Sequence, residues 1–166
     1  MTTEISNVSE RLGGKYLTFG LGEEEYGVRI GHVQEIIAML PVTRVPKTPE
    51  VVLGVINLRG KIVPIFDLHR KLGMTSATTT RHTCIIVVKV DQTAVGIVVD
   101  RVREVMAIGD DQIQPAPTFG ADVSTAHLLG IATTSGGARL LLAIERVLST
   151  SEVLAIGDEV GEAVAA

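Results

Sequence analysis

The feature that most constrains the fold of this chain is an internal repeat. Residues 26–36 (YGVRIGHVQEI) align with residues 95–105 (VGIVVDRVREV), which places Gly27 opposite Gly96 and apolar residues opposite apolar residues. Further along, the register shifts so that Gly54 falls opposite Gly130, and an arginine and a leucine again fall opposite their counterparts. Because the order of segments recurs as well, the repeat predicts two copies of one small structural unit.

The repeated unit has the texture of β-strands. Short runs rich in Val, Ile and Leu are separated by Gly, Asp and Pro, and a long hairpin is expected to turn at Asp91-Gln92. One short segment, DLHRKLG, has an aspartate start and a glycine stop that are typical of a capped helix. We therefore expect an all-β fold with a few short helices, in which two tandem five-stranded barrels share an apolar seam. Closing each sheet removes its exposed edges, and the seam enlarges a core that one unit alone would find marginal.

The same pattern sets the expected domain boundaries. Residues 15–73 form the first predicted barrel and residues 83–150 the second, with a polar, threonine-rich linker over residues 74–82. Residues 1–14 are expected to be a flexible polar arm. Residues 151–166 are expected to form a terminal helix or a frayed tail.

Composition excludes several classes of protein. The chain has 166 residues and a formal net charge of −4, without a dense Lys/Arg cluster, which argues against a nucleic-acid partner. Its one cysteine, Cys84, rules out an intramolecular disulfide and favours a reducing compartment. The polar N-terminus does not resemble a signal peptide, and no run approaches the ~20 apolar residues that span a membrane. We expect a cytoplasmic protein that does not insert into the membrane.

The residues that could carry chemistry are not arranged for it. No nucleophile elbow, phosphate loop or dinucleotide-binding fingerprint is present, and Cys84 is expected to act as a small hydrophobe. None of the histidines has metal-ligand spacing, and each is expected at the surface or in a loop: His32, His69, His82 and His127. We therefore expect no enzyme activity, no catalytic residue, no cofactor and no metal.

An arginine at a strand corner is the strongest candidate for binding. In residues 54–68 (GVINLRGKIVPIFDL), Arg59 and Gly60 lie between two apolar strands. Gly60 falls opposite Gly136 in the repeat, where we expect a positive φ in both copies, whereas Arg59 falls opposite Ser135. The fold thus requires the glycine but not the arginine. Arg59 could therefore bind a partner through the first copy alone, and the alternative is that its side chain is simply solvated. A groove between the barrels would suit a partner helix, with polar groups on its rim.

Four stretches together carry a family resemblance. These are FGLGEEEYGVRIGHVQEI, VTRVPKTPEVVLGVINLRGKIVPIFDL, VGIVVDRVREV and IQPAP, and in this order and spacing they resemble the CheW family of bacterial chemotaxis coupling proteins from about Lys15 to Glu152. The resemblance implies two intertwined five-stranded SH3-like barrels and an adaptor without catalysis. Such an adaptor bridges the cytoplasmic tip of methyl-accepting chemoreceptors and the regulatory domain of the histidine kinase CheA. It also implies a protein that is monomeric when free and builds rings in membrane-associated receptor arrays.

The resemblance also assigns residues. The receptor-contacting positions of the family fall on Val33, Glu35, Gly54, Asn57, Leu58, Arg59 and Val105. A kinase-facing surface falls around Val42, Thr43 and Arg44.

Each of these assignments has an alternative. Val33 and Val105 could belong to the core, Gly54 could serve backbone geometry alone, and Glu35 could pair locally, since Glu104 matches it in the second copy. Residues 37–40 (IAML) are more apolar than an exposed loop and are expected either to pack on a partner or to be a variant suited to a particular kinase.

Three other functions compete with this interpretation. A CheW-like coupler of a parallel chemosensory pathway that does not control swimming would have the same sequence features. A small β-barrel that binds nucleic acid is a third interpretation, although three Phe and two Tyr leave few platforms for stacking bases. A hydrolase fits the sequence least well.

Overall fold

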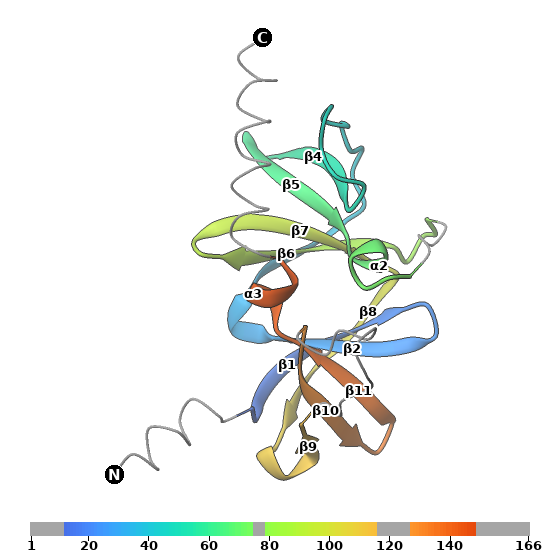
Figure 1. The fold of residues 1–166 in the computed structure, drawn as a ribbon, viewed down its shortest axis with the longest axis vertical. Coiled ribbons are helices and arrows are strands. Elements are labelled where there is room, and N and C mark those ends of the chain that lie inside the picture. The colour runs from blue at the N-terminus through green and yellow to red at the C-terminus, as the bar shows by residue number, and fades with distance from the viewer. Residues whose placement is uncertain (1–11, 75–78, 116–126, 149–166) are drawn as a thin grey trace.

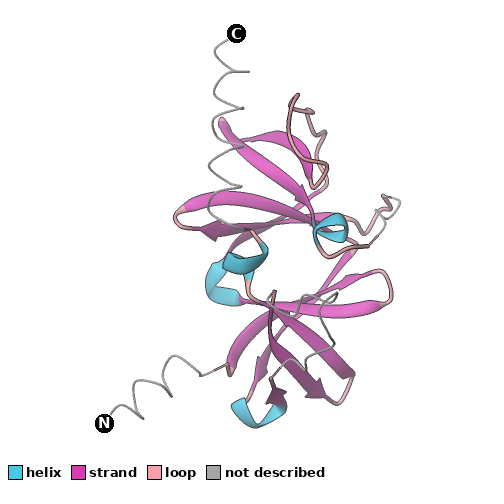
Figure 2. Cartoon of the chain, in the orientation of Figure 1, coloured by secondary structure: helices cyan, strands magenta, loops and turns pink. Residues whose placement is uncertain are grey.

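The structure is a computed structural model that describes residues 12–74, 79–115 and 127–148. Within these residues the chain is mostly β-strand, and its few helices are short (Figure 2). The predicted all-β class is therefore confirmed. Most of the predicted N-terminal arm, part of the predicted linker and the whole predicted tail at 151–166 lie outside the described residues. No helix in the described part is long and apolar enough to cross a membrane.

The elements follow one another in a simple order. The first half comprises β1 (Gly14–Leu21), β2 (Glu24–Arg29), the 3-10 helix η1 (Ile30–His32), β3 (Val33–Ala38), β4 (Val52–Leu58), β5 (Lys61–Asp67) and α2 (Leu68–Lys71). The second half comprises β6 (Cys84–Val90), β7 (Thr93–Val99), β8 (Arg101–Ile108), the 3-10 helix η2 (Asp110–Gln112), β9 (Ile113–Gln114), β10 (Leu128–Thr134), β11 (Gly137–Leu142) and α3 (Ile144–Val147).

The bounds of these elements confirm the internal repeat. When the two copies are aligned so that Gly27 matches Gly96, β1 aligns with β6, β2 with β7 and β3 with β8. When Gly54 is aligned with Gly130, β4 aligns with β10, β5 with β11 and α2 with α3. The first and last residues of α2 and α3 then coincide. The extra residues of the second copy fall between β8 and β10. The two halves of the chain therefore form the same succession of elements.

The two copies do not form separate sheets. One sheet has six strands in the order β8-β1-β2-β11-β10-β9, and the other has five in the order β3-β6-β7-β5-β4 (Figure 1). The first hairpin of each copy thus pairs with the last three main strands of the other copy. The predicted division into a barrel over residues 15–73 and a barrel over 83–150 is therefore wrong, because each sheet takes strands from both ranges. The chain passes from one sheet to the other between β2 and β3 and again between β7 and β8.

The sixth strand explains why one sheet exceeds the predicted five strands. Strand β9 is two residues long and pairs with β10, with Gln114 opposite Ile131. In the other sheet, the corresponding contact is a single β-bridge between Thr43 and Val55. Both copies therefore close at the same place, and the difference in strand number is small.

A glycine in each copy allows the exchanged strands to pack. Strands β2 and β11 are parallel, with Gly27 opposite Leu141, and strands β7 and β5 are parallel in the same register, with Gly96 opposite Ile65. A Cβ atom on Gly27 would lie 3.1 Å from the Leu141 side chain, and one on Gly96 would lie 2.5 Å from the Ile65 side chain. The glycine match detected in the sequence thus reflects a close approach of strands in both sheets.

Among the described residues, three apolar clusters hold the fold together. The largest, here called the seam cluster, includes side chains of both hairpins and of the short helices α2 and α3, which lie between the two groups of strands in Figure 2. The inner cluster of the five-stranded sheet consists of Ile56, Leu58, Val63, Ile65, Ile85, Val87 and Val98. The inner cluster of the six-stranded sheet consists of Tyr16, Ile108, Ala132 and Leu141. The seam predicted from the sequence is therefore the main core of the protein.

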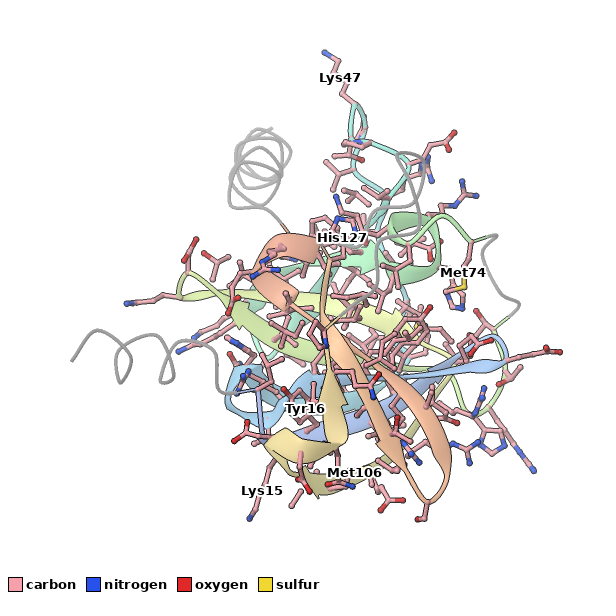
Figure 3. The ribbon with its side chains drawn as sticks, turned by 60° about the horizontal axis from the view of Figure 1, so that its bottom comes forward. Lys15, Tyr16, Lys47, Met74, Met106 and His127 are labelled. Atoms are coloured by element: carbon pink, nitrogen blue, oxygen red, sulfur yellow. The ribbon has the colours of Figure 1, made fainter. Side chains whose placement is uncertain are left out.

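Strand β1 passes from the surface into the core, with its first two residues exposed and the remaining six buried. Lys15 is exposed and points away from the body of the protein, whereas Tyr16 is fully buried (Figure 3). The Tyr16 hydroxyl donates to the Leu12 carbonyl, and the Arg29 guanidinium lies 5.6 Å from the centre of its ring. Burial raises the pKa of Tyr16, so the phenol stays neutral and remains a donor.

Candidate functional site

The corner between β4 and β5 is a two-residue turn that contains an unusual arginine. Leu58 lies opposite Lys61, so only Arg59 and Gly60 form the turn, with φ angles of +51° and +87°. Tight hairpin turns that match the twist of their strands need positive φ at both positions, which suits Asn-Gly or Gly-Gly better than arginine. The Gly60 N–H donates to Asn57 Oδ1 at 2.8 Å and stabilises the turn. Geometry alone therefore does not select an arginine at position 59.

The equivalent turn of the second copy, between β10 and β11, has a different backbone conformation. Thr134 lies opposite Gly137, and the positive φ of +110° falls on Gly137 rather than on Gly136. The prediction that Gly60 and Gly136 both need a positive φ is therefore wrong for Gly136. Ser135 holds the place of Arg59, and the guanidinium near this corner comes instead from Arg139 on β11, whose Nη1 donates to Thr134 Oγ1.

A β-bulge orients Glu35 toward the same corner. The pairing of β3 with β6 shifts between Val33 and Glu35, and β8 shifts at the equivalent place against β1. Beyond the bulge, Glu35 lies opposite Val87, a member of the inner cluster of the five-stranded sheet. The Glu35 side chain therefore starts from the inward face of the sheet and is only 24% exposed.

Arg59 and Glu35 form an ion pair across the sheet. Arg59 Nη2 donates to Glu35 Oε2, and the Arg59 side chain is 68% exposed. The hydrogen bond from Arg59 lowers the pKa of the Glu35 carboxyl, and Glu35 in turn raises the pKa of Arg59, so both groups are charged at neutral pH. The pair joins β3 to the β4–β5 turn, which belong to opposite edges of the five-stranded order. Arg59 is thus held by a partner within the chain without being buried by it.

Gly54 is explained by the closure of the sheet. After β3 the chain runs back along β4, where Thr43 and Val55 exchange two backbone hydrogen bonds of 2.8 Å each. Gly54 lies beneath this bridge with φ of +146°, and a Cβ atom there would lie 2.7 Å from the Thr43 carbonyl carbon and 2.9 Å from the Val42 side chain. Its counterpart Gly130 lies under β9, where a Cβ atom would be 2.7 Å from the Gln114 carbonyl oxygen. The backbone therefore requires a glycine here in both copies.

The other predicted receptor-contacting residues are spread over different surroundings. Asn57 is exposed, Leu58 is 9% exposed and belongs to the inner cluster of the five-stranded sheet, and Val33 is half-buried against the seam cluster. Val105 is 49% exposed on β8, an edge strand of the six-stranded sheet. The structure thus joins Glu35, Asn57 and Arg59 at one corner, and places Val105 on the other sheet.

Sequence reasoning missed two exposed apolar side chains near this corner. Ile36 is 44% exposed and follows Glu35, and Ile62 is 42% exposed and lies opposite Asn57. Ile36 is the repeat counterpart of Val105, so the alignment of the two copies held the signal that would have found it.

The predicted kinase-facing residues lie in the segment that closes the sheet. Thr43 and Arg44 are exposed, whereas Val42 is half-buried against the inner cluster of the five-stranded sheet. Ile37, Met39 and Leu40 pack against the same cluster, so the apolar stretch IAML covers the core of its own chain and needs no partner to explain it. Lys47 extends from the tip of the loop that follows (Figure 3).

One histidine contradicts the expected surface position. His69 in α2 is 4% exposed, with Nδ1 3.6 Å from Asp67 Oδ1 and Nε2 3.1 Å from Asp100 Oδ2. Asp100 Oδ2 also accepts a hydrogen bond from the Gly22 N–H at 2.6 Å, so the group ties α2 to the β1–β2 turn. Among the described residues, no set of three or more His, Cys, Asp or Glu side chains is arranged to hold a metal ion.

Comparison with known proteins gives one consistent family. The CheW-like domain family model matches residues 15–152. A chemotaxis protein CheW from Klebsiella aerogenes is 42% identical over 162 residues, which cover 98% of this chain and 97% of the relative. Protein FrzA from Myxococcus xanthus is 30% identical over 144 residues and covers 86% of this chain and 89% of its own. The crystal structure of the scaffolding protein TtCheW from Thermoanaerobacter tengcongensis superposes with a TM-score of 0.76 at 33% identity and covers 85% of this chain and 96% of its own.

Proposed function

The chain belongs to the CheW family of chemotaxis adaptors, and we propose that it couples methyl-accepting chemoreceptors to a histidine kinase of the CheA type without catalysing a reaction. The single observation that supports the receptor contact most strongly is the placement of Arg59. Its guanidinium is exposed and held by Glu35, it occupies a turn position that favours other residues, and the second copy lacks it.

The proposed receptor surface is the corner formed by Glu35, Asn57 and Arg59. An arginine that is already oriented by a carboxylate loses less side-chain freedom when a partner binds, and its remaining N–H groups can still donate to a second acceptor. Leu58 belongs to the inner cluster at the base of this turn, whereas Gly54 lies beneath the bridge between Thr43 and Val55. Val33 and Val105 remain proposed contacts, with Val105 offering the more exposed side chain.

The proposed kinase surface is the segment around Val42, Thr43 and Arg44. Thr43 and Arg44 expose their side chains, while the backbone of Thr43 is fixed by its bridge to Val55. A segment anchored in this way presents its side chains from a rigid base, which limits the entropy lost on binding. Because Arg59 lies on a different turn, the two contacts should be separable by mutation.

Co-sedimentation tests both contacts at once. Receptor-tip fragments and the kinase regulatory domain are each mixed with wild type, with Arg59→Gln and with a matched control, Arg81→Gln, which removes one exposed charge from a distant loop. We expect Arg59→Gln to lose most receptor binding and to keep kinase binding, while the control keeps both. Full receptor binding by folded Arg59→Gln would remove Arg59 from the surface. Failure of the wild type to bind either partner would refute the adaptor role itself.

A coupler of a parallel pathway that does not control swimming is the second candidate. The match to Protein FrzA, which is not named as a chemotaxis protein, keeps this candidate open. Expression in a swimming bacterium that lacks its own coupling protein distinguishes the two candidates. Restored chemotactic rings in soft agar would favour the coupler of swimming chemotaxis. Binding to receptor and kinase without restored rings would favour the coupler of a parallel pathway.

We place the protein at the cytoplasmic side of receptor arrays and expect it to be monomeric when free. The kinase and receptor contacts both need open surfaces, which a stable dimer through the same surfaces would cover. Light scattering of the isolated protein should give the mass of one chain, and mixtures with the kinase regulatory domain should give larger assemblies.

A further inference from the structure

A cluster of charged side chains lies at one end of the six-stranded sheet. Glu25 on β2 and Arg101 on β8 flank Gly20 on the intervening strand β1. Arg103 Nε donates to Glu25 Oε1 at 2.9 Å, and Arg101 Nη2 lies 3.8 Å from the same oxygen. A Cβ atom on residue 20 would lie 2.7 Å from Arg101 Nε, so the glycine lets Arg101 lie across the strand.

A third arginine completes this group, here called the arginine cluster (Arg101, Arg103, Arg139 and their counter-ion Glu25). Strand β11 runs parallel to β2 with Leu140 opposite Tyr26, which places Arg139 next to Glu25 in register. Arg139 Nη1 donates to Thr134 Oγ1, but its buried Nε has no acceptor among the described residues, and Glu25 Oε2 has no donor there. A buried N–H without an acceptor is costly and indicates that a partner completes the group.

The charges of the cluster do not balance. Arg101 and Arg103 both lie against the Glu25 carboxylate, and Arg139 follows on the neighbouring strand, although the whole chain carries a net charge of −4. Arg103 is 51% exposed and Arg101 is 33% exposed, so an incoming group can reach them from solvent. An excess of positive charge in an acidic protein marks a local preference for anions.

The other copy shows that the fold does not require these charges. The repeat counterparts of Glu25, Arg101, Arg103 and Arg139 are Ala94, His32, Gln34 and Val63. Val63 belongs to the inner cluster of the five-stranded sheet, and Ala94 packs against it. The five-stranded sheet therefore has no arginine at any of these positions, whereas the six-stranded sheet carries an arginine-rich end that its architecture does not need.

We propose that the arginine cluster is a docking site for an acidic segment of a protein partner, whose carboxylates engage Arg103 and Arg139. Planar guanidinium groups bind carboxylates through paired, charge-assisted hydrogen bonds, and several arginines around a small area favour a chain of carboxylates over a single one. The cluster lies on the six-stranded sheet and shares no residue with the corner of Arg59, so it does not rest on the proposed receptor and kinase contacts.

Fluorescence anisotropy with a labelled hexaglutamate peptide tests the site on the full chain. We expect wild type to bind at about 20 mM salt and to release the peptide at about 300 mM, because salt screens such contacts. Arg103→Gln and Arg139→Gln should each weaken binding about tenfold, the loss that corresponds to one charge-assisted hydrogen bond. Arg81→Gln removes an equal charge elsewhere and should leave binding unchanged, and circular dichroism checks that each variant is folded.

Glu25→Gln is the most informative variant, because a carboxylate-binding site and a purely structural ion pair predict different changes in peptide binding. If the site takes carboxylates, removing its competing carboxylate should strengthen hexaglutamate binding severalfold. If Glu25 and Arg139 serve only as each other's hydrogen-bond partners, the variant should be less stable and should bind the peptide no better than wild type. That result would overturn the proposal. Absence of wild-type binding at low salt, equal losses with Arg81→Gln, or displacement of the peptide by equimolar inorganic phosphate would also overturn it.

Discussion

The tight contact above Gly54 leads to the most quantitative prediction. Replacing Gly54 by alanine adds a Cβ atom 2.7 Å from the Thr43 carbonyl carbon and 2.9 Å from the Val42 side chain, at a φ of +146° that side-chain-bearing residues rarely adopt. Overpacking costs about 1–3 kcal/mol, and a disfavoured backbone conformation costs about 1–3 kcal/mol. Gly54→Ala should therefore lower the free energy of unfolding by about 2–6 kcal/mol, a large share of the stability of a typical domain.

Two other glycines separate these contributions. Gly22 has a φ of +59° with no atom within 4 Å of the place a Cβ atom would occupy, so Gly22→Ala carries backbone strain alone. Gly130 has no positive φ, but a Cβ atom there would lie 2.7 Å from the Gln114 carbonyl oxygen, so Gly130→Ala carries the steric clash alone. Each single contribution should cost about 1–3 kcal/mol. The loss in Gly54→Ala should approach the sum of the two controls.

Urea unfolding followed by circular dichroism measures these differences. With a slope of about 2 kcal/mol/M, a loss of about 4 kcal/mol moves the midpoint by about 2 M. The same variants should lose receptor binding only as far as they lose structure around Val42 and Thr43. A Gly54→Ala protein no less stable than Gly22→Ala would refute the steric argument. If that protein had also lost receptor binding, Gly54 would instead be a direct contact.

Three further predictions concern the ion pair and the cysteine. The double variant Glu35→Arg with Arg59→Glu forms an ion pair of opposite orientation, so it should unfold at the same urea concentration as wild type. It should nevertheless fail to bind receptor-tip fragments. Binding equal to that of wild type would mean that the pair acts only within the fold. Because hydrogen bonding from Arg59 lowers the pKa of Glu35 below its ordinary value of 4.5, the pair stabilises the protein above that pH, and its contribution is lost as the pH falls through the lower folded-state value. Glu35→Gln should lack this component of the acid unfolding curve, whereas Glu104→Gln, the matched change in the second copy, should retain it. Burial raises the pKa of Cys84, so its thiol should react with an aromatic disulfide reagent at pH 8 much more slowly in the native protein than in urea, and equal rates would contradict the half-buried position.

Comparison of the two copies separates architecture from function. Gly27 and Gly96 each leave room for a side chain of the neighbouring strand, and Gly54 and Gly130 each allow the close approach of a covering backbone segment. Arg59 has no such counterpart, and neither do the members of the arginine cluster. Because both copies have the same fold, a charged residue present in only one of them is free to serve a partner.

The strands, their order and their duplication could all be predicted from the amino-acid sequence. Runs of Val, Ile and Leu between turn residues are local signals, and the two registers of the repeat reproduce the observed strand bounds. The family motifs likewise lie in continuous stretches, so they could be read without coordinates. The same local reading put Arg59 at a tight corner, where the structure places it.

The strands that share a sheet and the side chains that meet could not be predicted without the three-dimensional fold. Two equivalent copies offer each hairpin equally suitable partners in its own half and in the other half, so hydrophobic periodicity does not distinguish separate units from exchanged ones. The Arg59–Glu35 pair, the burial of His69 beside Asp100 and the arginine cluster all join segments far apart in the chain. Such contacts depend on the path of the chain between sheets, which is a property of the whole fold rather than of any local stretch of sequence.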